Sequence, residues 1–236
     1  MNFEFSADQM QLKDIARKFL EKEDAVKRAR NVLENEESFD ENLWQQIIEM
    51  GFTATAIPEE YGGLGLGYLE LCVIAEELGR SLAPTPFSSS VYLATEAILN
   101  SGDNSLKQNY LPSLANGEKI GSFAHSESNT SPTESNIQCN VSGNALSGKK
   151  IAVVDGDISN FFVVSAKNGS NVGLYLVDAS SDGVGIERQP TLDPSRSHAS
   201  VIFENAACHE LQSEWSSVTN LLDRAAVLFA LSLIHI

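Results

Sequence analysis

The chain has 236 residues, of which 42% are hydrophobic and 20% are charged. It is therefore long enough for one large or two modest domains, and too rich in aliphatic residues to be disordered. It carries 16 Lys and Arg against 32 Asp and Glu, a formal net charge of −16. Nucleic acids and anionic membrane surfaces bind basic faces, so this charge balance argues against both as partners.

The cysteines and histidines show no spacing typical of a metal site or a C-x-x-C pair. The cysteines are Cys72, Cys139 and Cys208. The histidines are His125, His198, His209 and His235. We therefore expect no metal site, buried or free thiols in a reducing compartment, and a cytoplasmic location. No secretory signal is visible, and the apolar run at 225–236 is shorter than the roughly 20 residues that span a bilayer, so we expect a core helix there.

The first half of the chain has the apolar periodicity of helices. Ser6 and Gln9 form a capping-box pattern, S-x-x-Q, in front of an apolar series over residues 12–20. A second helix is expected after Asp40, with Gly51 as its C-terminal stop.

A glycine-rich loop at residues 58–67 follows. Its glycines lie between helices rather than between a strand and a helix, so they do not match a dinucleotide-binding fingerprint. We expect a tight path between packed helices at Gly62, Gly63, Gly65 and Gly67. The next helix, over residues 68–82, is apolar on nearly every side and should be buried. Two more helices are expected over 88–101 and 104–115.

From residue 119 short β-branched runs replace the helical pattern. Strands are expected at 120–125, 137–141, 150–154, 161–165, 173–177, 185–189 and 199–203. Ser142-Gly143-Asn144 is a hairpin-turn sequence. Short strands at this spacing are typical of a small antiparallel barrel or sandwich. After about residue 213 the helical pattern returns.

The sequence thus predicts an α+β fold: an all-α N-terminal domain (1–118), a small antiparallel β-barrel or sandwich domain (119–212) and the start of a further helical part (213–236). His125 closes an apolar strand and opens a polar loop with Ser126. A hydroxyl and backbone N–H groups at a strand end suit hydrogen bonding to a planar heterocycle, and a capped loop without a ligand is the alternative interpretation.

The stretch over residues 58–80 resembles the signature of the acyl-CoA dehydrogenase family: proline, acidic residues, an aromatic, paired glycines, then a helix ending in V-I-A-E-E-L-G-R. The start of the chain also resembles that family's F-x-F-x-x-x-Q-x-x-L-x-x-x-x-R opening, at Phe3, Phe5, Gln9, Leu12 and Arg17. The resemblance covers residues 1–230.

The resemblance implies a third domain, a C-terminal helical bundle, and FAD bound between the middle and C-terminal domains. It implies α,β-dehydrogenation of an acyl-CoA thioester, with electrons passed to an electron-transfer flavoprotein, in a homo- or hetero-oligomer. The family's catalytic carboxylate and its adenosine-binding residues belong mostly to the bundle, so we assign no catalytic base. Glu59 and Glu60 could be considered for that role, but nothing places them near a flavin. Residues 82–92, together with residues of the bundle, are expected to line the acyl pocket.

The resemblance also implies flavin contacts. Ser126 takes the place of the threonine that binds the flavin in the family's A-x-T-E-P segment, and Phe123 and His125 would lie along the isoalloxazine edge. Ala152 and Val154 stand where the family's tryptophan and threonine cover the flavin. Proline and the A-G-S-D tail are missing.

These departures resemble a branch of the family, the pimeloyl-CoA dehydrogenase small-subunit type. Its F-A-H-x-E, G-x-K and L-V-x-A segments are similar to residues 122–127, 148–150 and 163–166, and Thr191 to Arg196 resembles its T-x-D-G-x-R turn. Members of this branch often pair with a different subunit. A non-catalytic partner subunit, and a flavin monooxygenase or oxidase on the same scaffold, are therefore alternative functions.

The last six residues, 231–236, look foreign to the family. They can be back-translated as CTG TCT CTT ATA CAC ATC, which resembles a transposon adaptor. We expect a longer native protein, with a natural terminus as the alternative, and we expect this chain by itself to be inactive.

Overall fold

The structure is a computed structural model that describes residues 5–235, so Phe3 and Ile236 of the patterns above lie outside it. Its helical elements are α1 (Ala7–Lys22), α2 (Ala25–Asn35), α3 (Glu41–Glu49), η1 (Glu59–Tyr61), α4 (Tyr68–Arg80), η2 (Ser88–Thr95), α5 (Glu96–Leu99), α6 (Asn104–Ala115) and α7 (Trp215–Ser232). Its strands are β1 (Gly121–Ala124), β2 (Asn140–Ser142), β3 (Ala145–Val154), β4 (Phe161–Asn168), β5 (Asn171–Asp178), β6 (Val184–Gln189), β7 (His198–Ala207) and β8 (His209–Gln212).

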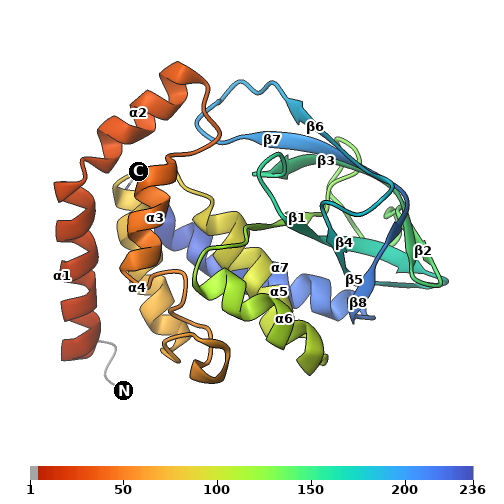
Figure 1. The fold of residues 1–236 in the computed structure, drawn as a ribbon, viewed down its shortest axis with the longest axis horizontal. Helices are drawn as coiled ribbons and strands as arrows, with labels where there is room; N and C mark the ends of the chain where they lie inside the picture. The colour runs from red at the N-terminus through yellow and green to blue at the C-terminus, as the bar shows by residue number, and fades with distance from the viewer. Residues whose placement is uncertain (1–4, 236) are drawn as a thin grey trace.

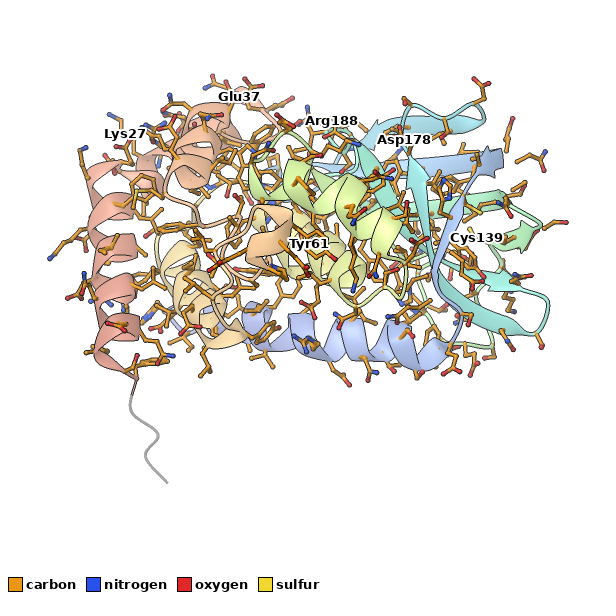
Figure 2. All side chains as sticks on the ribbon, turned by 60° about the horizontal axis from the view of Figure 1, so that its bottom comes forward. Lys27, Glu37, Tyr61, Cys139, Asp178 and Arg188 are labelled. Atoms are coloured by element: carbon orange, nitrogen blue, oxygen red, sulfur yellow. The ribbon has the colours of Figure 1, made fainter. Side chains whose placement is uncertain are left out.

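The helices and strands form two neighbouring halves. Helices α1 to α6 gather on one side, the strands gather on the other, and α7 runs from the helical half to the strands (Figure 1). Helix α7 packs against α4 and η2 at one end and against β5 at the other. The halves also meet where Arg188 of β6 donates to the carbonyl of Glu36 at 2.9 Å, close to the labelled Glu37 in Figure 2.

The predicted helix signals at the start of the chain are confirmed. Ser6 caps α1, because its Oγ accepts from the Gln9 N–H at 3.2 Å while Gln9 Oε1 accepts from the Ser6 N–H at 2.9 Å. Asp40 caps α3 by accepting from the Leu43 N–H at 2.8 Å. Gly51, with a φ of 75°, follows the end of α3, as expected of a glycine stop.

Helix α2 was not among the predicted helices. It is flanked by Asp24 and Glu36, which have φ values of 50° and 53° although neither is a glycine. Neither end carries the usual signal, since Asp24 makes no side-chain capping bond at the start of the helix and Glu36, rather than a glycine, is the left-handed residue at its end. Only Ala25 and Val32 of α2 are buried, so its apolar stripe is also short.

The predicted helix over 88–101 is continuous but changes type. Residues 88–95 form the π-helix η2, which runs directly into α5. Its serines hold the two halves together: Ser88 Oγ accepts from Arg196 at 3.0 Å, and Ser89 Oγ donates to Asp155 at 2.5 Å. Ser90 Oγ accepts from the Gly121 N–H at 3.4 Å.

The strands form one curved sheet of eight strands in the order β6-β7-β3-β2-β4-β5-β8, with β1 pairing with β4. Most pairs are antiparallel, as predicted, but β1–β4 and β2–β4 are parallel. The hairpin at Gly143 is confirmed, with Ser142 opposite Ala145. Strand β3 starts earlier than predicted, and the short β8, in which only Leu211 is buried, was missed.

Strand β4 shows how the sheet separates two cores. Phe161 and Val163 pack in a cluster with α5, α6 and α7, whereas Phe162 and Val164 face the interior of the sheet. Alternate residues of a strand point to opposite faces, so one strand serves both cores. The sheet curves over its interior, where Phe162 meets Phe203 of β7 edge to face at 6.1 Å.

The predicted core helix at the end of the chain is only partly correct. Helix α7 buries Val218, Leu221, Ala225 and Leu228. Beyond its end, Leu233 and Ile234 are 60% and 57% exposed. No helix among residues 5–235 has both the length and the apolar character that crossing a membrane requires.

A buried lysine joins β1 to β3. Lys150 is fully enclosed, and its ammonium group donates to Glu127 Oε1 at 2.8 Å, to the His125 carbonyl at 3.0 Å and to Ser165 Oγ at 3.1 Å. Glu127 also accepts from the N–H groups of Gln138 and Cys139, at 2.6 and 3.0 Å. Burial opposes its ionisation, but the hydrogen bond from Lys150 and those from the two N–H groups hold the pKa of Glu127 below its usual value.

The glycine loop gives a first prediction. A Cβ on Gly63 would lie 1.9 Å from the carbonyl oxygen of Ile57, which also accepts from the Gly65 N–H at 2.9 Å and so cannot move freely. We expect Gly63→Ala to lower the free energy of unfolding by about 2–3 kcal/mol in urea denaturation. In Gly102→Ala, the matched control, nothing lies within 4 Å of the new Cβ. Equal stabilities of the two variants would contradict the tight path.

The ion pair gives a second prediction. Glu127→Gln leaves the charge of Lys150 uncompensated in the interior, which we expect to lower the free energy of unfolding by about 3–5 kcal/mol. Adding Lys150→Met removes that charge, so the double variant should be more stable than Glu127→Gln alone. Chemical denaturation of the parent, the two single variants Glu127→Gln and Lys150→Met, and the double variant measures this coupling. If the two single changes in the free energy of unfolding add up to that of the double variant, the pair is not coupled.

Candidate functional site

The five residues predicted to contact a flavin lie on β1, on the two residues that follow it, and on β3. The Ile151 N–H donates to the Ser126 carbonyl at 2.8 Å, and Ser122 Oγ donates to the Val154 carbonyl at 2.8 Å. We call this junction the β1–β3 seam. It comprises residues 122–127 and 150–155, and so contains Phe123, His125, Ser126, Ala152 and Val154.

Aromatic rings line one face of the seam. Ser122 and Ala124 are buried on one face of β1, so Phe123 and His125 project from the other. The rings of Phe123 and His125 stack with centroids 5.0 Å apart and an interplanar angle of 16°. The ring of Trp215, the first residue of α7, stacks on His125 at 6.1 Å and 28°. The sequence interpretation missed Trp215, and its aromatic side chain at the start of the last helix was the available signal.

Ser165, which is hydrogen-bonded to the buried Lys150, holds the imidazole of His125 in place. Its Nδ1 lies 2.8 Å from Ser165 Oγ, and Ser165 also accepts from Lys150. Burial, together with the positive charge of Lys150, lowers the pKa of His125 to about 4, although Glu127 acts in the opposite direction. The imidazole is therefore neutral near pH 7.

Ser126, the residue after His125, has a free hydroxyl. Its carbonyl is fixed by Ile151, whereas its Oγ has no hydrogen-bond partner among residues 5–235 and is not fully enclosed. The side chain is half-buried at the end of β1, where the chain turns into the exposed loop that begins at Ser128. A half-buried hydroxyl that is free to donate or accept fits recognition of a polar ring edge.

The β3 side of the seam is apolar and irregular. Ala152 has a φ of 51° and lies in a bulge between Lys150 and Val153, which leaves its methyl group exposed. Val154 is half-buried and is followed by Asp155, which is fully buried with a φ of 56°. Bulges re-aim side chains at functional sites, and here the bulge presents a small apolar surface one residue away from Ile151, whose N–H binds the Ser126 carbonyl.

Asp155 connects the seam to a cavity. Its carboxylate is paired with the guanidinium of Arg196, which also donates to Ser88. Arg196 and Ser88 line a cavity of about 610 Å³ between the helical half and the loop that joins β6 to β7. The segment expected to line an acyl pocket contributes Leu82, Ala83, Pro84, Thr85, Phe87, Ser88 and Tyr92 to this cavity. The opposite wall contains residues of α2 and α7, including Leu33 and Phe229.

The carboxylates near the seam are already engaged. Glu127 accepts from Lys150 and from two backbone N–H groups, and Asp155 is paired with Arg196, so neither is free to accept a substrate proton. Glu59 and Glu60 are exposed on η1, which packs against α6, and neither lines the cavity. No catalytic base is therefore assigned.

The cysteines are buried free thiols, as predicted. Burial raises the pKa of Cys139 to about 12 and that of Cys208 to about 11, so both thiols are protonated and unreactive at neutral pH. Within residues 5–235 no group of three or more His, Cys, Asp or Glu side chains is placed to hold a metal ion.

Comparison with known proteins matches this architecture. Residues 6–118 match the acyl-CoA dehydrogenase N-terminal domain. The mitochondrial isovaleryl-CoA dehydrogenase of Arabidopsis thaliana is 32% identical over 181 residues, which are 74% of this chain and 44% of that protein. The acyl-CoA dehydrogenase FadE27 of Mycobacterium tuberculosis is 32% identical over 154 residues, 64% of this chain and 40% of that protein.

The fold is shared over nearly the whole chain. A solved structure described as the electron transferring flavoprotein of Acidaminococcus fermentans contains a chain that is similar at a TM-score of 0.88 and 25% identity, over 98% of this chain and 66% of that one. The chain spans less than half the length of the curated relatives named above, 44% and 40%. The match of the N-terminal domain, the sequence relatives and the common fold together show that the chain belongs to the acyl-CoA dehydrogenase family.

Proposed function

We propose that the chain is part of an FAD-dependent acyl-CoA dehydrogenase subunit, with the flavin ring held at the β1–β3 seam. The observation that carries the proposal is a pair of unpartnered polar groups on consecutive residues, Ser126 Oγ and His125 Nε2, with the exposed methyl group of Ala152 on the neighbouring strand β3. A planar heterocycle needs this combination of a flat apolar surface and a few convergent hydrogen-bonding groups.

The residues present fit FAD. Ser126 would bind a polar atom of the ring, the edges of Phe123 and His125 would border it, and Ala152 and Val154 would cover it. The bound cofactor supplies the acceptor for a hydride from the substrate. The chain itself holds the ring at a fixed seam, since Lys150 and the Ile151–Ser126 hydrogen bond keep the two strands together.

The cavity suits the acyl part of a thioester. Its walls are mainly aliphatic and aromatic side chains, and Arg196 and Ser88 provide the polar groups next to Asp155. Apolar pockets with few polar groups bind chains such as acyl groups by excluding water. We infer that an acyl-CoA is the substrate, because the cavity and the seam adjoin through Asp155 and Arg196.

The partners follow from the same assignment. An electron-transfer flavoprotein would accept the electrons, and the protein would act as a homo- or hetero-oligomer. The structural relative from Acidaminococcus fermentans, described as an electron transferring flavoprotein, supports this link. The F-A-H-x-E, G-x-K and V-V-S-A segments support membership of the pimeloyl-CoA dehydrogenase small-subunit branch, with a different subunit as partner.

A non-catalytic partner subunit is the second candidate function. It is favoured by the engaged state of Glu127 and Asp155, which leaves the seam without a free carboxylate. It is also favoured by Ala152 and Val154, since neither side chain can form a hydrogen bond to the flavin.

FAD titration followed by quenching of flavin fluorescence tests the main proposal. We expect the parent chain to bind FAD and Ser126→Ala to bind it about three- to tenfold more weakly, which corresponds to the loss of one hydrogen bond. Ser128→Ala is the matched control, because its exposed Oγ hydrogen-bonds, among the described residues, only with Thr130 in the same loop. A parent chain that binds no FAD would reject the main proposal and favour the partner-subunit function.

A second experiment tests the lack of a base. Adding an acyl-CoA anaerobically to the chain loaded with FAD should leave the visible absorbance of the oxidised flavin unbleached. The reason is that no carboxylate at the seam is free to take the α-proton. Bleaching would show that a base is present among these residues and would contradict the engaged state of Glu127 and Asp155.

A further inference from the structure

We propose that His125 is a fixed hydrogen-bond donor: Lys150 and Ser165 hold its ring as the Nε2–H tautomer, and Nε2–H donates to an acceptor atom of the flavin ring that lies against Ser126. The identity of the acceptor rests on the proposed function. The tautomer follows from contacts within the chain alone.

The argument starts from the ammonium group of Lys150, which has three hydrogens and no acceptor. These hydrogens are directed to Glu127 Oε1 at 2.8 Å, to the His125 carbonyl at 3.0 Å and to Ser165 Oγ at 3.1 Å. Burial lowers the pKa of Lys150, but the carboxylate of Glu127 opposes this change, and three acceptors surround the charge. Ser165 is therefore an acceptor toward Lys150, and its own hydrogen is left for another partner.

That partner is Nδ1 of His125, which lies 2.8 Å from Ser165 Oγ. Ser165 is fully buried, and among residues 5–235 its Oγ forms hydrogen bonds only with Lys150 and His125. Because the hydroxyl donates to Nδ1, that nitrogen carries a lone pair, and the proton of the neutral ring is on Nε2. The opposite tautomer would leave the hydroxyl hydrogen of Ser165 buried without an acceptor, which is costly.

The neighbours of the ring keep it neutral. The charged groups facing it are Lys150 of β3 and Glu127 of the following loop, and the rings of Phe123 and Trp215 enclose it on β1 and α7. Burial and the charge of Lys150 together lower the pKa of His125 to about 4. Near pH 7 the ring therefore has one N–H group and one acceptor nitrogen, and the acceptor is used by Ser165.

The remaining nitrogen is available to a ligand. Nε2 of His125 makes no hydrogen bond with residues 5–235, and it is not completely buried. It is next in sequence to Ser126, whose hydroxyl is also unpartnered. At these two consecutive residues, His125 can only donate, whereas Ser126 can donate or accept.

The tautomer is tested by long-range ¹H–¹⁵N correlation spectra of the ¹⁵N-labelled chain at pH 7. We expect the Nε2 resonance of His125 at the position of a protonated nitrogen and the Nδ1 resonance at that of an unprotonated one. Removal of the relay in Ser165→Ala should add a detectable Nδ1–H population, with the amide spectrum as the control for folding. A parent ring with the proton on Nδ1 would overturn the inference, whether or not the variant folds.

The role toward flavin is tested by two substitutions at His125. The amide of His125→Gln can place an N–H group near the position of Nε2, whereas His125→Leu cannot donate. We expect His125→Leu to bind FAD about three- to tenfold more weakly and to shift the flavin reduction potential to more negative values, because an N–H donor stabilises the electron-rich reduced ring. His125→Gln should retain most of both properties.

The outcomes separate this inference from the proposed function. If the parent chain binds FAD and His125→Leu has the affinity and potential of the parent, the donor role is overturned while the proposed function stands. If the parent chain binds no FAD, both the proposed function and the donor role toward flavin fail. In that case the nitrogen spectra still decide whether Lys150 and Ser165 fix the tautomer.

Discussion

The site depends on one buried cation and the three acceptors around it. Lys150 has no exposed surface, so its ammonium group is stable only because a carboxylate, a carbonyl and a hydroxyl receive its hydrogens. Each acceptor belongs to a different part of the site. Glu127 binds the N–H groups of Gln138 and Cys139, His125 directly follows the last residue of β1, and Ser165 of β4 contacts the imidazole. A single charge therefore fixes the relative positions of the strand end, the loop and the ring.

A similar arrangement joins the site to the helical half. Asp155 lies next to Val154 at the end of β3, is fully buried, and pairs with Arg196, while Ser88 and Ser89 of η2 complete the set of contacts. Because η2 also lines the cavity, the same contacts fix the cavity wall relative to the β1–β3 seam. In this protein, buried ion pairs position the parts of the site, and the apolar clusters on both faces of β4 hold the two halves around them.

The sequence predicted the features that depend on neighbouring residues. The capping box at Ser6 and the hairpin at Gly143 are local patterns, and the strand end at His125 is marked by a change from apolar to polar residues. The α+β fold and the family followed from longer patterns, and both are confirmed. The flavin-contact roles and the domain boundaries remain predictions.

Other features could not be read from the sequence, for physical reasons. The contacts of Lys150 with Glu127 and Ser165, and the position of Trp215 over His125, join residues that are distant in the chain. The left-handed backbone of Ala152 is set by the bulge in β3, since alanine itself does not favour it. Helix α2 is flanked by non-glycine residues with positive φ, so the sequence carries no glycine signal for where the helix starts or ends.

The central claim is that the β1–β3 seam holds a flavin, and the amide chemical shifts of the ¹⁵N-labelled chain during titration with FAD test it most directly. The account predicts changes concentrated at residues 122–127 and 150–155, with the first residues of α7 also affected through Trp215. Changes confined to other segments, such as the glycine loop at residues 58–67, or no changes at saturating FAD, would contradict it.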